Sequence, residues 1–148
     1  MTGNGDNASL HTLGDRGKTV DVPENDVRDR TVKDKDGKGI GTVADLLVDD
    51  REGKVRFLQV EHGGFLGFGE TTTLIPVDAV TKITTSDVFV DQSRDRVAGA
   101  PGYDPDLVDD RPYHSSIYGY YGYPPYWGAG YIYPQGLWGM QPGRPPTP

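Results

Sequence analysis

The chain has 148 residues, a formal net charge of −7 and only 34% hydrophobic residues. It contains no cysteine, which excludes disulfide scaffolds, thiol catalysis and thiolate metal sites. An acidic chain without a basic stripe argues against direct nucleic-acid binding, which depends on Lys and Arg at phosphates. The negative charge favours a basic protein partner instead, because it steers the two molecules together.

The distribution of apolar residues predicts neither a secretory signal nor a membrane span. Its polar first twenty residues hold no apolar stretch of the kind that a secretory signal needs. No run of about 20 apolar residues predicts a membrane span. We therefore expect a cytoplasmic protein without a membrane span.

The N-terminal segment, residues 1–19, has few apolar side chains and no hydrophobic period. Such a segment cannot bury enough surface to offset the entropy lost on ordering. We therefore expect residues 1–19 to be disordered.

Residues 20–103 have the pattern of a β domain, in which short runs rich in Val, Ile, Leu and Thr alternate with turns. No window shows a 3.6-residue period over ten residues. Short strands at this spacing predict an all-β fold, and a small six-stranded barrel is favoured because closure removes unpaired edges. The predicted strands are residues 31–33, 40–48, 55–61, 71–77, 81–84 and 88–90. In the second of them, one face is predicted to carry Ile40, Thr42, Ala44, Leu46 and Val48.

Two polar turns and one glycine-rich loop connect the early strands. The turns, at residues 34–38 and 49–53, carry Gly37 and Gly53, which supply the positive φ of a hairpin. The loop begins at Gly63 and ends at Gly69. Its apolar residues either plug one end of the barrel or form an exposed patch for a partner, and both alternatives stay open. They are Phe65, Leu66 and Phe68.

Residues 104–148 are predicted to form a low-complexity tail rich in Gly, Pro and aromatic residues. From Tyr113 onward the tail holds eight of the nine tyrosines and both tryptophans. It could be an interaction tail whose aromatic rings bind a partner or another copy of the chain, a segment that folds back over the barrel, or a segment without a role. The side chains expected to contact a partner are Tyr118, Tyr120, Tyr121, Tyr123, Tyr126, Trp127 and Trp138.

Four motifs occur in an order that resembles the PRC-barrel family, named for the H subunit of the photosynthetic reaction centre. They are D-G-x-x-I-G-x-V at residues 36–43, V-D-x-x-x-G-K-V at 48–55, Gly-Gly-Phe-Leu at 63–66 and Ile-Pro-Val-Asp-Ala-Val at 75–80. The resemblance covers roughly residues 22–103. It implies a six-stranded barrel that serves as a docking or assembly module, in stand-alone bacterial copies sometimes associated with stress responses. It implies no shared catalytic residues.

These observations predict a non-catalytic adaptor. No nucleophile–base–orienter set and no metal-ligand spacing is visible, so we expect no catalytic residues, no metal and no cofactor. The partner is expected to be another protein, with a basic one favoured, or a second copy of the chain. One alternative is a small-molecule or ion-binding barrel whose mouth is the loop from Gly63 to Gly69. Another is an accessory factor in ribosome assembly.

Overall fold

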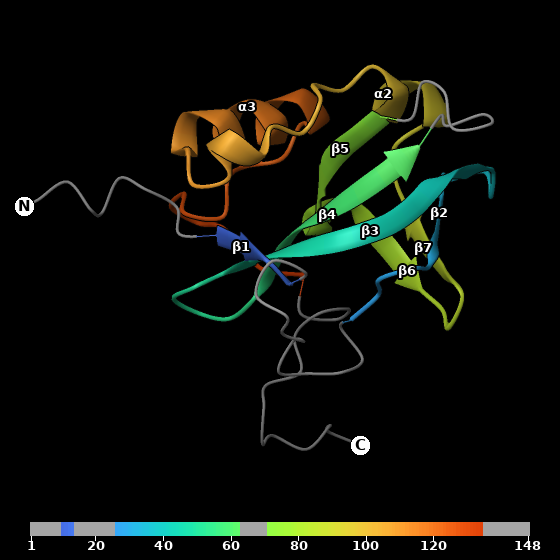
Figure 1. Ribbon diagram of the computed structural model, residues 1–148, viewed down its shortest axis with the longest axis horizontal. Helices are drawn as coiled ribbons and strands as arrows, with labels where there is room; N and C mark the ends of the chain where they lie inside the picture. Colours follow the sequence, from blue (N-terminus) through green and yellow to red (C-terminus); the bar gives the residue numbers. More distant parts are fainter. Residues whose placement is uncertain (1–9, 14–25, 63–70, 135–148) are drawn as a thin grey trace, which may run out of the picture.

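The computed structural model describes residues 10–13, 26–62 and 71–134, and the strands of these ranges form one curved sheet (Figure 1). The strand order along the sheet is β5-β4-β3-β2-β7-β6, and β1 pairs with β3 off this path. The predicted all-β fold and its six main strands are confirmed. The strands are β1 Leu10–Thr12, β2 Thr31–Lys33, β3 Gly39–Asp49, β4 Val55–His62, β5 Thr71–Pro76, β6 Val80–Ile83 and β7 Asp87–Val90.

The sheet is mixed and curves into a half-barrel (Figure 1). All neighbouring strands are antiparallel except β2 and β7, which run parallel. Pro76 ends β5, since a proline cannot donate to a further ladder bond. The short 3₁₀ helix η3, Val77–Ala79, then turns the chain into β6.

The face predicted for β3 is only partly correct. Thr42 is exposed, whereas its neighbour Val43 is buried, and Leu47 is buried beside Leu46. The pairing of β3 with β4 shifts register twice, between Val43 and Asp45 and between Leu47 and Val48. Each such bulge adds a residue to one strand and restarts the alternation of faces, which a strict period of two does not capture.

Both predicted turns are present. Gly37 has a φ of 84° and Gly53 a φ of 68°, so each occupies the left-handed region that glycine adopts without strain. In the first turn, the Asp34 side chain accepts hydrogen bonds from the backbone N–H groups of Asp36 at 2.9 Å and Lys38 at 2.8 Å. Asp34 is therefore a turn-forming residue.

Residues 10–13 depart from the expected disorder of the N-terminal segment. Strand β1 pairs antiparallel with β3, with Leu10 opposite Asp49, and the side chains of Leu10 and Leu13 are buried. The Leu10 N–H also donates to the Asp109 carboxylate at 2.9 Å. The prediction was wrong here because the long strand β3 extends past β2 and offers free backbone groups to a further strand. The rest of residues 1–19 lies outside the described residues.

The C-terminal segment contains a helix that the sequence pattern did not predict. Helix α3, Arg111–Tyr121, begins after Asp110, whose side chain caps the Tyr113 N–H at 2.9 Å. It ends at Gly122, which has a φ of 83°. Its buried residues share one face at helical spacing. They are His114, Ile117, Tyr118 and Tyr121. Because only one of the four is aliphatic, the hydrophobic period was too weak to detect.

Helix α3 completes the core of the half-barrel. It lies across the side of the sheet that carries β5, next to the short helix α2, Arg94–Ala98 (Figure 1). The Tyr118 and Phe57 rings pack with centroids 5.1 Å apart, and the His114 and Phe57 rings 5.5 Å apart. Of the open alternatives for the tail, the structure therefore shows the fold-back for residues 111–133.

Candidate binding site

The predicted contact residues of the C-terminal segment fall into three groups. Tyr118 is fully buried and Tyr121 is 5% exposed, so the expectation that these two contact a partner at the surface is wrong. They are buried because they lie on the inner face of α3. Four side chains are half-buried and keep part of their rings at the surface, namely Tyr120, Tyr123, Tyr126 and Trp127. Their role in binding stays a prediction. Phe65, Leu66, Phe68 and Trp138 lie outside the described residues.

Tyrosine hydroxyl groups attach the C-terminal segment to the barrel. The Tyr120 hydroxyl donates to the Arg96 carbonyl at 2.6 Å, and the Tyr133 hydroxyl donates to the Val55 carbonyl at 3.1 Å. The Tyr123 hydroxyl donates to the Asp91 carboxylate. These three bonds reach α2, β4 and the end of β7, so the segment crosses a wide part of the barrel.

Arg56 of β4 is the charged centre of the region under this segment. Its side chain is only 3% exposed, and its Nε donates to Asp49 Oδ2 at 2.8 Å. Its Nη2 donates to the Glu52 carboxylate in the turn between β3 and β4. Burial alone would lower the pKa of Arg56, but the Asp49 carboxylate outweighs that effect and raises it. Arg56 is therefore a fixed cation.

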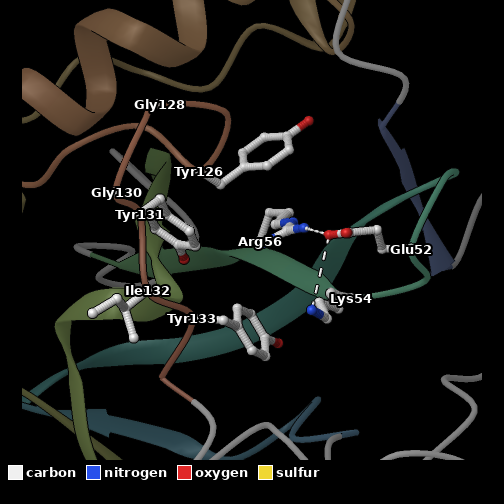
Figure 2. Close-up of a pocket in the computed structure, with 9 residues that line it drawn as sticks. All are labelled: Glu52, Lys54, Arg56, Tyr126, Gly128, Gly130, Tyr131, Ile132 and Tyr133. Carbon is white, nitrogen blue, oxygen red and sulfur yellow. Dashed lines mark hydrogen bonds and ion pairs between the residues drawn. The ribbon is translucent and has the colours of Figure 1, made fainter.

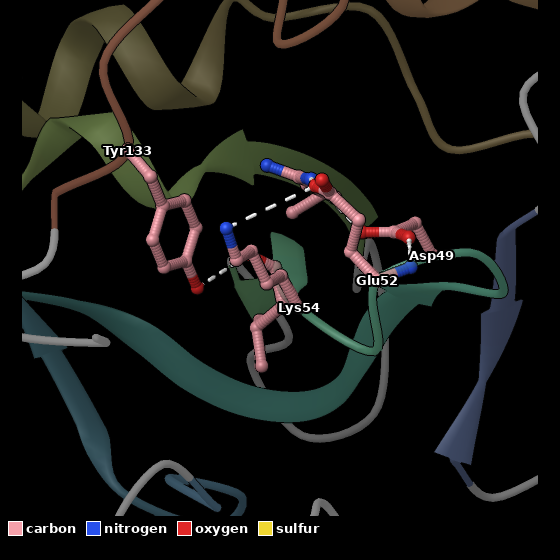
Figure 3. Close-up of polar contacts among 6 residues, drawn as sticks. Asp49, Glu52, Lys54 and Tyr133 are labelled. Carbon is pink, nitrogen blue, oxygen red and sulfur yellow. Dashed lines mark hydrogen bonds and ion pairs between the residues drawn. The ribbon is translucent and has the colours of Figure 1, made fainter. Parts of the chain in front are cut away.

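Two tyrosine rings cover the cations of the hairpin. The Arg56 guanidinium lies 4.2 Å from the centroid of the Tyr126 ring and 5.3 Å from that of Tyr133. The Lys54 ammonium lies 5.0 Å from the Tyr133 centroid. Figure 3 shows Lys54 between Tyr133 on one side and Glu52 on the other. Cation–π contacts of this kind hold the tyrosine rings and the hairpin in fixed relative positions.

A cavity of about 400 Å³ opens between this hairpin and the C-terminal segment. Figure 2 shows Tyr126 and Tyr133 on opposite sides of Arg56, with Glu52 and Lys54 at one edge and Ile132 pointing outward. The volume falls in the range of small-molecule sites. The lining residues are Glu52, Lys54, Arg56, Tyr126, Gly128, Gly130, Tyr131, Ile132 and Tyr133.

Three polar atoms near the cavity are buried and closed to solvent. They are Asp78 Oδ1 and the hydroxyl oxygens of Tyr118 and Tyr131. Burial raises the pKa of Tyr131, and the nearby Asp78 carboxylate raises it further. The Tyr131 hydroxyl and the Asp78 carboxylate therefore interact directly, through charge and a side-chain hydrogen bond. Burial also raises the pKa of Asp78.

The acidic cluster before α3 consists of Asp104, Asp106, Asp109 and Asp110. Three of these carboxylates accept hydrogen bonds from backbone N–H groups. The Asp104 carboxylate accepts from the Asp106 N–H at 3.0 Å, Asp109 accepts from Leu10, and Asp110 caps α3. The carboxylates of Asp104, Asp106 and Asp109 belong to exposed residues. They contribute negative charge to the surface next to α3.

The residues that build the cavity were not among the predicted contact residues, except for Tyr126. One signal was available for Arg56: it interrupts an otherwise apolar strand between Val55 and Phe57. A charged residue in such a position requires a buried partner. The sequence could not indicate that Tyr131 and Tyr133 return to the same place, since about 75 residues separate them from β4.

The described residues form neither a metal-binding cluster nor a membrane-spanning helix. In residues 10–13, 26–62 and 71–134, no group of three or more His, Asp or Glu side chains could hold a metal ion. No helix in this part of the chain is long and apolar enough to cross a membrane.

The fold and the site together define a class of protein: a half-barrel β domain whose side is closed by a C-terminal helix and an aromatic segment. The PRC-barrel domain matches residues 22–97, just over half of the chain, and the chain belongs to that family. This confirms the resemblance seen in the four motifs. No curated protein matches the chain. The matched region ends within α2, so α3 and the tyrosines of the cavity lie beyond it.

Proposed function

We propose that this protein is a non-catalytic adaptor that docks a partner protein through the aromatic surface of its C-terminal segment. The observation that carries the proposal is that Tyr120, Tyr123, Tyr126 and Trp127 are each half-buried. Their inner parts pack against the core while their outer parts remain at the surface. Aromatic side chains held in this way lose little freedom on binding, and Tyr and Trp dominate the energy of protein interfaces.

The ring contacts within this surface support rigid presentation. Trp127 packs edge-on against Tyr118 and Tyr126, with centroids 6.0 Å and 5.1 Å apart. The Arg111 guanidinium lies 4.5 Å from the centre of the Trp127 ring. A partner would therefore meet a preformed surface, which lowers the entropy cost of association.

The charge around this surface favours a basic partner. Exposed Asp91, Asp95, Asp104, Asp106 and Asp109 surround α3 and its preceding loop, and the chain as a whole carries a net charge of −7. Complementary charge at the rim of an interface mainly accelerates association and depends on salt. The association rate of the complex should therefore fall as ionic strength rises.

Site-specific crosslinking tests the proposal. Benzoylphenylalanine replaces Tyr120 in the full-length chain, and the matched control carries it at Phe89, a half-buried aromatic on β7. After irradiation in cells that naturally make the protein, a discrete crosslinked protein is expected at position 120 and not at 89. A second copy of the chain at position 120 would assign the surface to self-association.

Affinity measurements complete the test. The Tyr120→Ala and Tyr123→Ala variants should bind the captured partner about tenfold or more weakly, while Phe89→Ala binds normally. Circular dichroism on each variant checks that the fold is intact. Equal crosslinking at both positions, or none at either, would contradict the adaptor proposal.

A further inference from the structure

The cavity between the β3–β4 turn and residues 126–133 has a balanced set of charges. Two cations, Lys54 and Arg56, line it, and two carboxylates pair with these cations. Asp49 and Glu52 both bind Arg56, and Glu52 also lies 3.9 Å from the Lys54 ammonium. Because these charges neutralise one another locally, the cavity offers little net attraction to either an anion or a cation.

The balanced charges still provide hydrogen-bonding groups at fixed positions. Lys54 supplies ammonium donors, and the Glu52 side chain, 56% exposed, supplies carboxylate acceptors. Donors and acceptors are thus interleaved over a short distance, which suits a ligand with many hydroxyl groups.

The tyrosine rings provide the other part of such a site. Tyr126 and Tyr133 line the cavity on opposite sides of Arg56 (Figure 2), and their contacts with Arg56 and Lys54 hold the rings in place. An aromatic ring offers an apolar face and, in tyrosine, a polar end. A sugar ring has the complementary construction: C–H groups on its faces and hydroxyl groups around its edge.

We propose that this cavity binds a neutral sugar, as a monosaccharide or disaccharide. Its volume of about 400 Å³ lies within the range of small-molecule sites. A purely apolar ligand would leave Glu52 and Lys54 without replacement for their water, at a cost in affinity. A small ion would leave the tyrosine walls unused. The proposal does not depend on the adaptor function. Tyr126 belongs to both the cavity and the aromatic surface, but Tyr120 and Tyr123, on which the docking test rests, do not line the cavity.

The test uses ¹⁵N-labelled full-length protein titrated separately with glucose, galactose, mannose, maltose and trehalose. At least one sugar is expected to shift the amide resonances of Glu52, Lys54, Gly128 and Gly130 in a saturable way. Sodium acetate and tetramethylammonium chloride serve as ionic probes and should leave these resonances unshifted.

Two lysine variants localise the binding. Lys54→Met removes the ammonium donors of the cavity and should weaken the sugar about tenfold, the effect of one lost hydrogen bond to a charged group. Lys82→Met is the matched control, because Lys82 lies over the Phe89 ring and does not line the cavity. It should bind the sugar normally.

Some outcomes would overturn the proposal. If none of the five sugars shifts the cavity resonances at millimolar concentration, the cavity is not a sugar site. If acetate or tetramethylammonium shifts the same resonances saturably, the site selects ions. If Lys54→Met and Lys82→Met weaken the sugar equally, binding lies elsewhere on the protein.

Discussion

Arg56 and Asp49 form a buried ion pair, with their side chains only 3% and 4% exposed. Glu52 adds a second carboxylate, and Tyr126 covers the guanidinium. Removing one partner of such a pair leaves the other charge buried and unpaired, which is far more costly than losing a pair at the surface. The packing of the C-terminal segment on the hairpin therefore depends on Arg56.

We predict that Arg56→Met lowers the free energy of unfolding by about 3–5 kcal/mol, because Asp49 then stays buried without a counter-charge. The matched control is Arg28→Met. Arg28 pairs with Asp26 at 2.7 Å, but these side chains are 28% and 22% exposed, so the loss should be about 1 kcal/mol or less. Urea denaturation measures both. Similar losses in the two variants would contradict this account of Arg56.

His114 is a second residue whose burial has a measurable consequence. Its ring is fully buried, and its Nε2 lies 2.8 Å from the Val108 carbonyl, so Nε2 carries the proton and donates. Its Nδ1 has no partner among the described residues. Burial lowers the pKa of His114 below 6.5, although Asp109 and Asp110 oppose this and Arg111 adds to it.

We predict that the protein loses stability as the pH falls below about 6.5, the pKa of an unperturbed histidine. In that range the unfolded chain takes up a proton on His114 that the folded protein does not, so the free energy of unfolding decreases. The loss should stop growing once the pH is below the lowered pKa of the folded state. Melting temperatures between pH 8 and pH 5 measure it.

The histidine variants assign the effect. His114→Gln should show a smaller pH slope than the parent chain. His62 also has a pKa lowered by burial, but it is only half-buried. His62→Gln should therefore keep most of the slope. If the pH slope survives in His114→Gln and vanishes in His62→Gln, His62 rather than His114 causes the loss of stability.

At the scale of single elements, β3 is the strand on which the sheet is built. It pairs with β1, β2 and β4 and carries two register shifts. Gly41 allows the close approach to β4: a Cβ atom there would lie 2.2 Å from the Glu61 carbonyl oxygen. The glycine of the I-G-x-V motif is thus required by backbone contact rather than by an unusual φ.

We predict that Gly41→Ala lowers the free energy of unfolding by about 1–3 kcal/mol, since β3 and β4 must separate to accommodate the methyl group. Gly39→Ala is the matched control, because a Cβ atom at Gly39 would meet nothing within 4 Å. Chemical denaturation compares the two variants. Equal stability of Gly41→Ala and the parent chain would show that the strands have more space there than the structure indicates.

At the scale of the whole molecule, the half-barrel and the C-terminal segment share one core. Phe57 of β4 packs against His114 and Tyr118 of α3, and Tyr133 is buried over Val55. Ile117 and Tyr121 are also buried. The family region alone would expose these surfaces to water, which costs free energy in proportion to the apolar area uncovered.

We predict that a chain ending at residue 103 melts at a lower temperature than the full chain and binds a hydrophobic dye such as ANS. A synthetic peptide of residues 104–134 should restore part of the melting temperature, since binding to the folded state alone stabilises it. A peptide with Tyr118 replaced by Ala is the control and should restore less. An unchanged melting temperature after truncation would show that α3 adds nothing to the core.

The sequence by itself determined the local features of this protein. Short apolar runs, Gly37 and Gly53 predicted the main strands and the two polar turns correctly, because these depend on neighbouring residues. The order of four motifs also identified the family. The periodicity failed at the bulges of β3 and in α3, where His114 and the tyrosines replace aliphatic residues on the buried face.

Only the tertiary structure decided which tyrosines are buried and where the cavity lies. Tyr118 and Tyr120 are two residues apart in a similar sequence context, yet one is in the core and the other at the surface, because a helix turns its faces every few residues. Arg56 meets Tyr126 and Tyr133 only after the chain has folded back over the sheet. Contacts over such a separation depend on the packing of whole elements, which no local pattern encodes.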